Sequence, residues 1–228
     1  MFNHPLQPGV IPPKMKTLNL SNKFNHEFVV GALPDSITTL YSNGYNQRFR
    51  ADSLPSSLTY LNCESYDRPI DAPNTFPESL TTLELVTFDS DIEPGALPSR
   101  LSTLYLGNLF NRPLRPHALP DSLTSLVLSH KFNQPLMPGA LPRNLLSFDM
   151  GSEYNHPLDT QLLPQSLTHL FFGRKFNQVL TSDMMPSSLT SLGLFVRAQN
   201  TLKLSYDTFK HYGHNVKILR MSGQINST

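Results

Sequence analysis

Apolar residues recur along the chain in a fixed block, L-x-x-L-x-L, whose last part alternates between apolar and polar positions. An alternation of period two is typical of a β-strand that buries one face. Nine such blocks follow one another at intervals of 21 or 22 residues. They predict one short strand in each copy, centred on Leu18, Leu40, Leu61, Leu83, Leu104, Leu126, Phe148, Leu170 and Leu192.

The rest of each copy is rich in Pro, Gly and Asn, which excludes long helices there. Each copy begins with an aromatic residue followed by Asn or Asp, and Pro stands ten residues after the aromatic, or eleven in the fourth copy. One strand and an irregular return in 20–29 residues is the leucine-rich-repeat pattern. We therefore expect a repeat solenoid with one parallel β-sheet of about ten short strands and irregular return segments. A parallel β-helix is the rival fold, but it would show two or three strand patterns in each coil.

The last part of the chain departs from this period. A tenth block, Val216/Leu219/Met221, lies 27 residues after the ninth, which leaves room for a short helix near residues 205–212. We expect residues 1–194 to form nine repeats, and residues 195–228 to form a modified last coil that acts as a cap. The first strand, within residues 15–20, would lie at an open sheet edge, where Lys14 and Lys16 discourage edge pairing and where a partner could bind.

The residue after each aromatic forms a polar column along the solenoid. A side-chain amide can satisfy both N–H and C=O groups of a buried turn, so the column predicts a ladder that bridges adjacent coils. Because Asp67 and Asp89 lack the amide donor, we expect the ladder to be weakest there. The asparagines of the predicted ladder are Asn3, Asn25, Asn46, Asn111, Asn133, Asn155 and Asn177.

The outward positions of the predicted sheet vary in charge and size, whereas the inward positions hardly change. Aromatic and polar groups on a surface free of packing constraints are typical of recognition sites; neutral drift on a solvated face is the alternative. The Thr or Ser that follows the first leucine of most blocks indicates local hydroxyl bonding rather than an ice-binding plane, since the outward row is irregular. The predicted partner-binding face consists of Tyr41, Tyr60, Asn62, Glu84, Tyr105, Val127, Asp149 and Phe171.

Composition narrows the classes of function. A net charge of +1 argues against a dedicated nucleic-acid binder. The single cysteine excludes an internal disulfide framework and a Cys-rich zinc site. The sequence shows no signal peptide and no apolar stretch of membrane-spanning length. We expect an intracellular protein in the cytoplasm that binds neither nucleic acid nor membrane.

Catalytic and metal-binding patterns are incomplete. His4 and His26 could stack in adjacent coils, but no third ligand is evident. The segment that begins at Asp89 starts like a calcium loop and then has Pro94 where the loop needs Gly. Cys63 fills a core position of its block and is expected to be buried. The H-x-x-H pair His211 and His214 lacks the Glu of a zinc protease. We therefore predict a non-enzymatic protein without cofactor or metal.

The motif F-N-[QHR]-P-L-x-P-G-A-L-P-x-S-L-x-x-L-x-L resembles the FNIP repeat, a leucine-rich-repeat variant, and the resemblance covers residues 2–194. Its best copies are 110–128 and 132–150. Such repeats are abundant in social amoebae and in giant viruses that infect amoebae. Many members resemble ubiquitin-ligase adaptors with an N-terminal F-box, and some amoebal members are reported as calmodulin binders. Here the repeats begin at Phe2, so the ligase role is not carried over.

The resemblance and the variable sheet face together predict a protein-interaction scaffold, as in a substrate-recognition module. The alternatives are a carbohydrate-binding solenoid and a structural repeat paralogue with no dedicated ligand.

Overall fold

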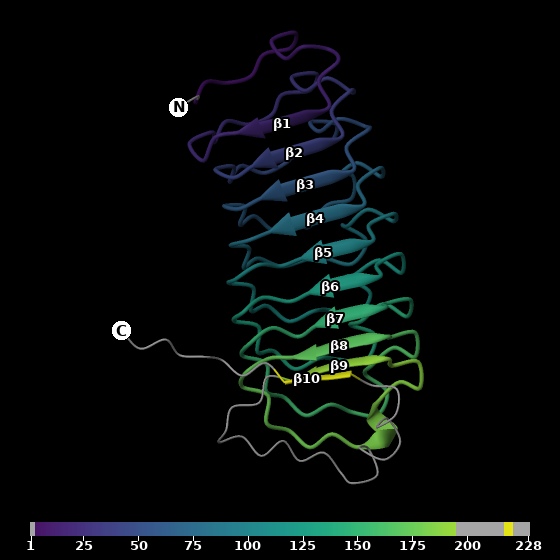
Figure 1. The fold of residues 1–228 in the computed structure, drawn as a ribbon. Coiled ribbons are helices and arrows are strands. Elements are labelled where there is room, and N and C mark those ends of the chain that lie inside the picture. The colour runs from purple at the N-terminus through teal and green to yellow at the C-terminus, as the bar shows by residue number, and fades with distance from the viewer. Residues whose placement is uncertain (1–2, 195–216, 221–228) are drawn as a thin grey trace, which may run out of the picture.

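A computed structural model describes residues 3–194 and 217–220 of the chain. Ten short strands form one parallel sheet, and their order in the sheet is their order in the sequence (Figure 1). This confirms the predicted leucine-rich-repeat-like solenoid. The strands are β1 (Thr17–Leu20), β2 (Thr39–Ser42), β3 (Tyr60–Cys63), β4 (Thr82–Leu85), β5 (Thr103–Tyr105), β6 (Ser125–Val127), β7 (Ser147–Asp149), β8 (His169–Phe172), β9 (Ser191–Leu194) and β10 (Lys217–Arg220).

The core lies between the sheet and the return segments. From β1 to β9 the second strand residue points inward and is buried, while the residues on either side of it face outward in most strands. The aromatic residue of each copy from Phe24 onward is buried as well. From Tyr45 onward its ring stacks on the ring of the next copy, with centroids 5.8 Å apart for Phe88 and Phe110 and 5.9 Å apart for Phe110 and Phe132. Adjacent copies therefore complete each other's core.

Hydroxyl groups tie the coils together where the chain enters each strand. Thr81 Oγ1 donates to the carbonyl oxygen of Thr59 at 3.0 Å, one copy earlier. A second column donates in the same way, as Ser79 Oγ does to the carbonyl oxygen of Leu58 at 2.6 Å. Local hydroxyl bonding, the interpretation given above to the Thr positions, is confirmed.

A tight turn forms a corner in the return segments, and in three copies this corner has the sequence Pro-Gly. In the fifth copy the N–H of Ala96 donates to the carbonyl oxygen of Glu93 at 3.2 Å, and Gly95 has φ of 76°. This is the pattern of a type II turn with Pro at its second position and Gly at its third. In the ninth copy a 3₁₀ turn, η1 (Ser182–Met184), occupies this corner; the sequence pattern had not indicated it.

The ends of the sheet differ from the expectation at one point. β10 pairs with β9 so that Leu219 lies opposite Gly193 and Ile218 opposite Leu192. The expected block placed Leu219 opposite Leu192, so its register was wrong by one residue. At the other end β1 pairs only with β2 among the described strands. The helix expected near residues 205–212 falls outside the described residues. In the part of the chain that the structure describes, no helix is long and apolar enough to cross a membrane.

Candidate functional site

Neighbouring strands bring the outward residues of the first half of the sheet into line. The sheet register places Tyr41 opposite Asn62, Asn62 opposite Glu84, and Glu84 opposite Tyr105. Tyr60 occupies the adjacent outward row of β3, two residues before Asn62. All five side chains are half-buried. We call these five residues the tyrosine–glutamate cluster.

Direct contacts join four members of the tyrosine–glutamate cluster. The rings of Tyr41 and Tyr60 lie with their centroids 5.3 Å apart and their planes tilted by 51°. Asn62 Nδ2 donates a hydrogen bond to Glu84 Oε2 at 2.7 Å. Burial, a hydrogen bond with Glu84 and the charge of that carboxylate raise the pKa of Tyr60 to about 12. Tyr105 is the direct cross-strand neighbour of Glu84, at a strand spacing of about 4.8 Å.

The second half of the face is more apolar. Asp149 lies between Val127 and Phe171 in the same outward row. Its carboxylate accepts a hydrogen bond from the N–H of Gly151 at 2.9 Å, and burial raises the pKa of the Asp149 carboxyl. The Phe171 ring lies over Gly193, where a Cβ atom would overlap with it. The eight residues of the predicted face thus form two groups, one around Glu84 and one around Asp149.

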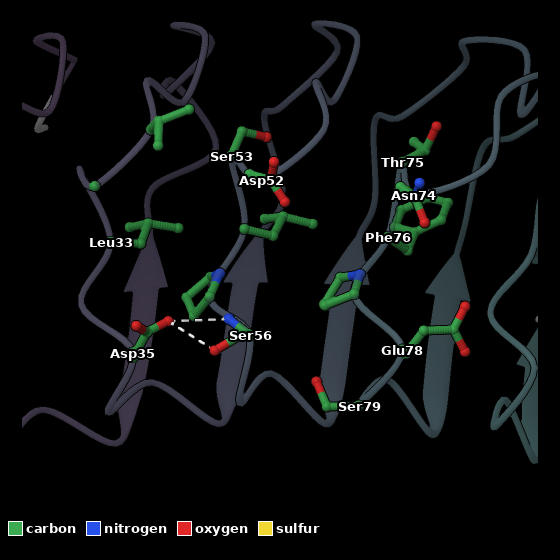
Figure 2. Close-up of a pocket in the computed structure, with 15 residues that line it drawn as sticks. Leu33, Asp35, Asp52, Ser53, Ser56, Asn74, Thr75, Phe76, Glu78 and Ser79 are labelled. Carbon is green, nitrogen blue, oxygen red and sulfur yellow. Dashed lines mark hydrogen bonds between the residues drawn. The ribbon is translucent and has the colours of Figure 1, made fainter.

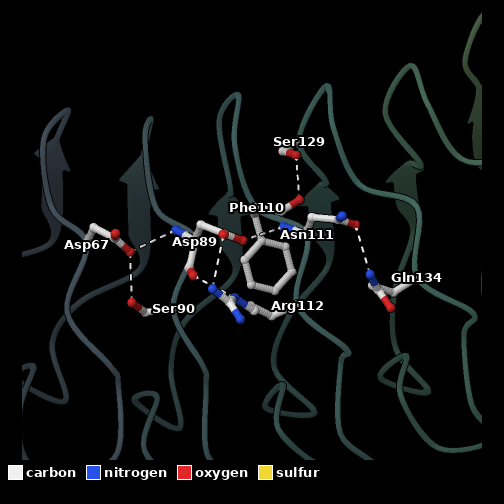
Figure 3. A network of polar contacts seen from close by, with 8 residues as sticks. All are labelled: Asp67, Asp89, Ser90, Phe110, Asn111, Arg112, Ser129 and Gln134. Atoms are coloured by element: carbon white, nitrogen blue, oxygen red, sulfur yellow. Dashed lines mark hydrogen bonds and ion pairs between the residues drawn. The ribbon is translucent and has the colours of Figure 1, made fainter.

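The aspartates and asparagines after the aromatic residues form a chain of hydrogen bonds along the solenoid (Figure 3). In each step from Asn25 to Asn177 the side-chain oxygen accepts the backbone N–H of the equivalent residue in the next copy, as Asn133 Oδ1 does from Asn155 at 3.0 Å. The hydrogen bonds to the aspartates are equally short: Asp89 N lies 3.0 Å from Asp67 Oδ1, and Asn111 N lies 2.8 Å from Asp89 Oδ1. The expectation that the ladder weakens at the aspartates is wrong, because the ladder uses the oxygen and not the amide donor.

The backbone carbonyl oxygen of a ladder residue is not bonded by an amide of the ladder. In several copies its donor is the side chain that follows the ladder residue of the next copy. Arg112 Nε donates to the carbonyl oxygen of Asp89 at 2.8 Å, and Gln178 Nε2 donates to that of Asn155 at 3.0 Å. A ring nitrogen of His156 lies 2.9 Å from the carbonyl oxygen of Asn133. The sequence had suggested a role for this position only through the incomplete metal pair His4 and His26. The restriction of this position to side chains with N–H groups in most copies was the signal that could have revealed the role.

Ion pairs also link successive copies, and all of those between described residues lie outside the strands. Arg112 pairs with Asp89 at 3.3 Å, so one guanidinium joins the ladder and the ion pairs (Figure 3). Neither Glu84 nor Asp149 takes part in an ion pair with a described residue. The full set is Arg48–Asp71, Arg50–Glu27, Arg112–Asp89, Arg115–Glu93, Arg143–Asp121 and Lys175–Glu153.

A pocket of about 530 Å³ lies among the corners of the second, third and fourth copies (Figure 2). Its apolar lining includes the buried side chains of Leu33 and Phe76. The carboxylates at its rim are largely occupied: Asp35 accepts from the N–H of Ser56 at 3.0 Å, and Glu78 accepts from the next copy in the same way. The fourth copy has one extra residue before its Pro, which was the available signal for an irregular corner.

Among the candidates that lie in the described part of the chain, the structure shows no catalytic or metal-binding arrangement; His211 and His214 lie outside the described residues. Cys63 is fully buried, and burial raises the pKa of its thiol, as expected for a core residue. Asp89 pairs with Arg112 and belongs to the ladder. Within residues 3–194, no group of three or more His, Cys, Asp or Glu side chains is placed to hold a metal ion.

Comparison with known proteins agrees with this geometry. The family profile of the FNIP repeat matches residues 2–41, 45–85, 66–109, 110–153 and 154–194. A similar solved structure is the crystal structure of CroV588, described as a novel circular LRR protein structure, from a giant virus. The TM-score is 0.73 at 29% sequence identity, over 99% of this chain and 36% of that one. The chain thus spans about a third of the length of that protein. No curated protein matches the sequence.

Proposed function

The chain belongs to the FNIP repeat family, and from this we propose that it is a non-enzymatic scaffold that binds another protein on its sheet face. The fold itself is a leucine-rich-repeat solenoid, an architecture that commonly serves as a protein-interaction scaffold. The partner-binding surface is the outward side of β2 to β8, with the tyrosine–glutamate cluster in its first half, on β2 to β5. A role as a substrate-recognition module is one form of this function.

The observation that carries the proposal is the contrast between the two sides of each strand. The inward residues Leu61, Leu83 and Leu104 are fully buried and almost identical from copy to copy. Outward, the same strands carry Asn62, Glu84 and Tyr105, which differ in charge and size and remain half-exposed. Packing therefore constrains only the inward residues, and the outward ones are free to be selected for binding.

The spacing of the sheet-face carboxylates supports a non-enzymatic role. Glu84 and Asp149 lie on β4 and β7, three strand spacings apart, which is about 14 Å at roughly 4.8 Å for each spacing. Pairs of carboxylates that cleave glycosidic bonds stand within roughly 5–10 Å of each other. The two groups are too far apart to act together on one bond.

The test compares three forms of the protein as bait in an amoebal lysate. They are the wild type, the triple variant Tyr41→Ala/Tyr60→Ala/Tyr105→Ala, and the control Met137→Ala, whose side chain is 50% exposed outside the strands. A captured protein is then purified, and its affinity for each form is measured by calorimetry. We expect the control to bind like the wild type and the triple variant to bind at least tenfold more weakly, since hot-spot aromatics contribute about 2 kcal/mol or more each.

If the triple variant bound the purified partner as tightly as the wild type does, the assignment of the sheet face as the partner-binding surface would be wrong. Binding of a glycan, and of no protein, through the same tyrosines would replace the proposal with a carbohydrate-binding solenoid. A protein without any ligand in either assay would be a structural repeat paralogue.

A further inference from the structure

The charge on the sheet face is distributed differently from the charge on the rest of the molecule. Over the whole chain Lys and Arg number 18 and Asp and Glu number 17, so the charges nearly balance. Strands β1 to β9 contain Glu84 and Asp149 but no Lys or Arg. The sheet face formed by these strands is therefore acidic within a nearly neutral protein.

Six carboxylates outside the strands each form an ion pair with an Arg or Lys of a neighbouring copy, whereas others, such as Asp35 and Glu78, accept from neutral donors. Asp89 and Glu93 in the fifth copy each pair with an arginine of the sixth, at 3.3 and 2.5 Å. Glu84 belongs to the preceding, fourth copy and is bonded by the neutral amide of Asn62. A neutral donor orients the carboxylate without cancelling its charge. Glu84 is thus held in a fixed position with its negative charge uncompensated by any described side chain.

The surroundings of Glu84 suit a cation. Tyr60 on one side and Tyr105 on the other flank the carboxylate, and Tyr41 packs against Tyr60 at 5.3 Å. The faces of aromatic rings attract cations, and the attraction increases when the site is partly shielded from water. A carboxylate offers about four lone-pair sites, and Asn62 together with Tyr60 uses only part of them. A planar guanidinium can fill the remaining sites while its face lies on a tyrosine ring.

We infer that the tyrosine–glutamate cluster is the docking site for an arginine side chain of the protein partner. The inference rests on the proposed function and deepens it, because it states the chemistry of the residue that the sheet face recognises. Arginine is preferred over lysine because only a guanidinium combines bidentate bonding to a carboxylate with stacking on aromatic rings. The partner therefore presents an exposed arginine.

The first experiment uses N-acetyl-arginine amide as the probe and follows the tyrosines by NMR after selective ¹³C labelling of their rings. The chain has eight tyrosines, and the buried Tyr45, Tyr66 and Tyr154 serve as internal controls. The matched probe is N-acetyl-citrulline amide, which has the same shape without the charge. We expect arginine to shift the signals of Tyr60 and Tyr105, citrulline to leave them nearly unchanged, and neither to move the buried rings.

Variants then identify the groups responsible. Glu84→Gln keeps an oxygen for Asn62 and removes the charge; it should weaken arginine binding about fivefold, the effect of losing roughly 1 kcal/mol. Asp91→Asn removes an exposed carboxylate of the return segment and should leave binding unchanged. Tyr105→Phe should bind like the wild type, whereas Tyr105→Leu should bind about two- to fivefold more weakly, because only the ring is required.

Equal shifts with arginine and citrulline, or equal binding by the Glu84→Gln and wild-type proteins, would overturn the inference. Unchanged signals of the buried tyrosines show that each variant is folded. The two proposals fail separately. If Glu84→Gln holds the purified partner at full strength while the triple alanine variant releases it, the arginine site is wrong and the scaffold function stands. If arginine binds at the cluster but the partner does not need the sheet face, the cluster recognises arginine, and the assignment of the sheet face as the partner-binding surface is wrong.

Discussion

Replacement of a single ladder residue tests how the coils are held together. Asn133 Oδ1 accepts the N–H of Asn155 at 3.0 Å, and no hydrogen bond between described residues uses the Nδ2 group of Asn133. Asn133→Ala removes the acceptor and leaves the N–H of Asn155 without its partner. Asn133→Asp keeps an oxygen in the same place, as the natural aspartates Asp67 and Asp89 do.

The magnitude follows from one hydrogen bond at an exposed position. A typical intramolecular hydrogen bond contributes about 1 kcal/mol, and water replaces part of it here because both side chains are exposed. Asn133→Ala should therefore lower the free energy of unfolding by about 1 kcal/mol, which corresponds to roughly 2–4 °C in Tm for a chain of this size. Asn133→Asp should stay within about 0.5 kcal/mol of the wild type.

Urea and thermal unfolding of the three proteins measure these differences, and amide hydrogen exchange locates them. In Asn133→Ala the amide of Asn155 should exchange faster, while amides three copies away should be unchanged, because each copy contacts only its neighbours. If Asn133→Asp destabilised the protein as much as Asn133→Ala does, the amide donor would matter. The account of the ladder as an oxygen-only device would then be refuted.

Three further changes test other parts of the structure. Tyr154→Phe should leave stability unchanged or raise it by up to about 1 kcal/mol in urea unfolding, because no described residue is placed to form a well-aligned hydrogen bond with the buried Tyr154 hydroxyl; a clear loss of stability would contradict this reasoning. Gly173→Ala should lower the free energy of unfolding by about 3 kcal/mol or more, because the added Cβ would overlap with the carbonyl oxygen of Gly151 in the preceding copy. Gly95→Ala meets only open space and should cost about 1 kcal/mol, because of its positive φ. Equal losses of stability in the two glycine variants would contradict the steric argument. Glu84→Gln should lower the pKa of Tyr60 from about 12 toward its ordinary value of 10, measured by ¹³C NMR titration, because the charge and the hydrogen bond of the carboxylate are lost while burial remains. An unchanged pKa would show that Glu84 does not interact with the Tyr60 hydroxyl.

The strand positions were predictable because each block anchors its own register. In the fourth copy the apolar residues Leu80, Leu83 and Leu85 leave one arrangement that buries all three, and β4 adopts it. The tenth block does not have this property. In a strand, Val216 and Ile218 would face one side of the sheet, and Leu219 and Met221 would face the other. Either pair could face the core, so the pattern permits two registers. The pairing of Ile218 with Leu192 is the register that the apolar pattern could not select.

The ladder shows a different limit of sequence reasoning. Asn offers both a donor and an acceptor, and its repetition alone does not tell which of them is used. Asp67 and Asp89 in place of asparagines could have indicated an acceptor, but they were interpreted as a loss of the donor. The geometry was needed to show that the carbonyl oxygens are satisfied by the residue that follows in the next copy, as by Arg112. The contacts of the tyrosine–glutamate cluster were likewise beyond the sequence, because they depend on side-chain directions across neighbouring strands.

Site-specific photo-crosslinking tests the central claim, that the sheet face binds the partner, most directly. A benzophenone amino acid is placed either at Val127, in the outward row of the sheet, or at Met137, which is exposed outside the strands. The account predicts that the Val127 position captures the purified partner and the Met137 position does not. Capture from Met137, with none from Val127, would place the binding surface on the return side and contradict the account.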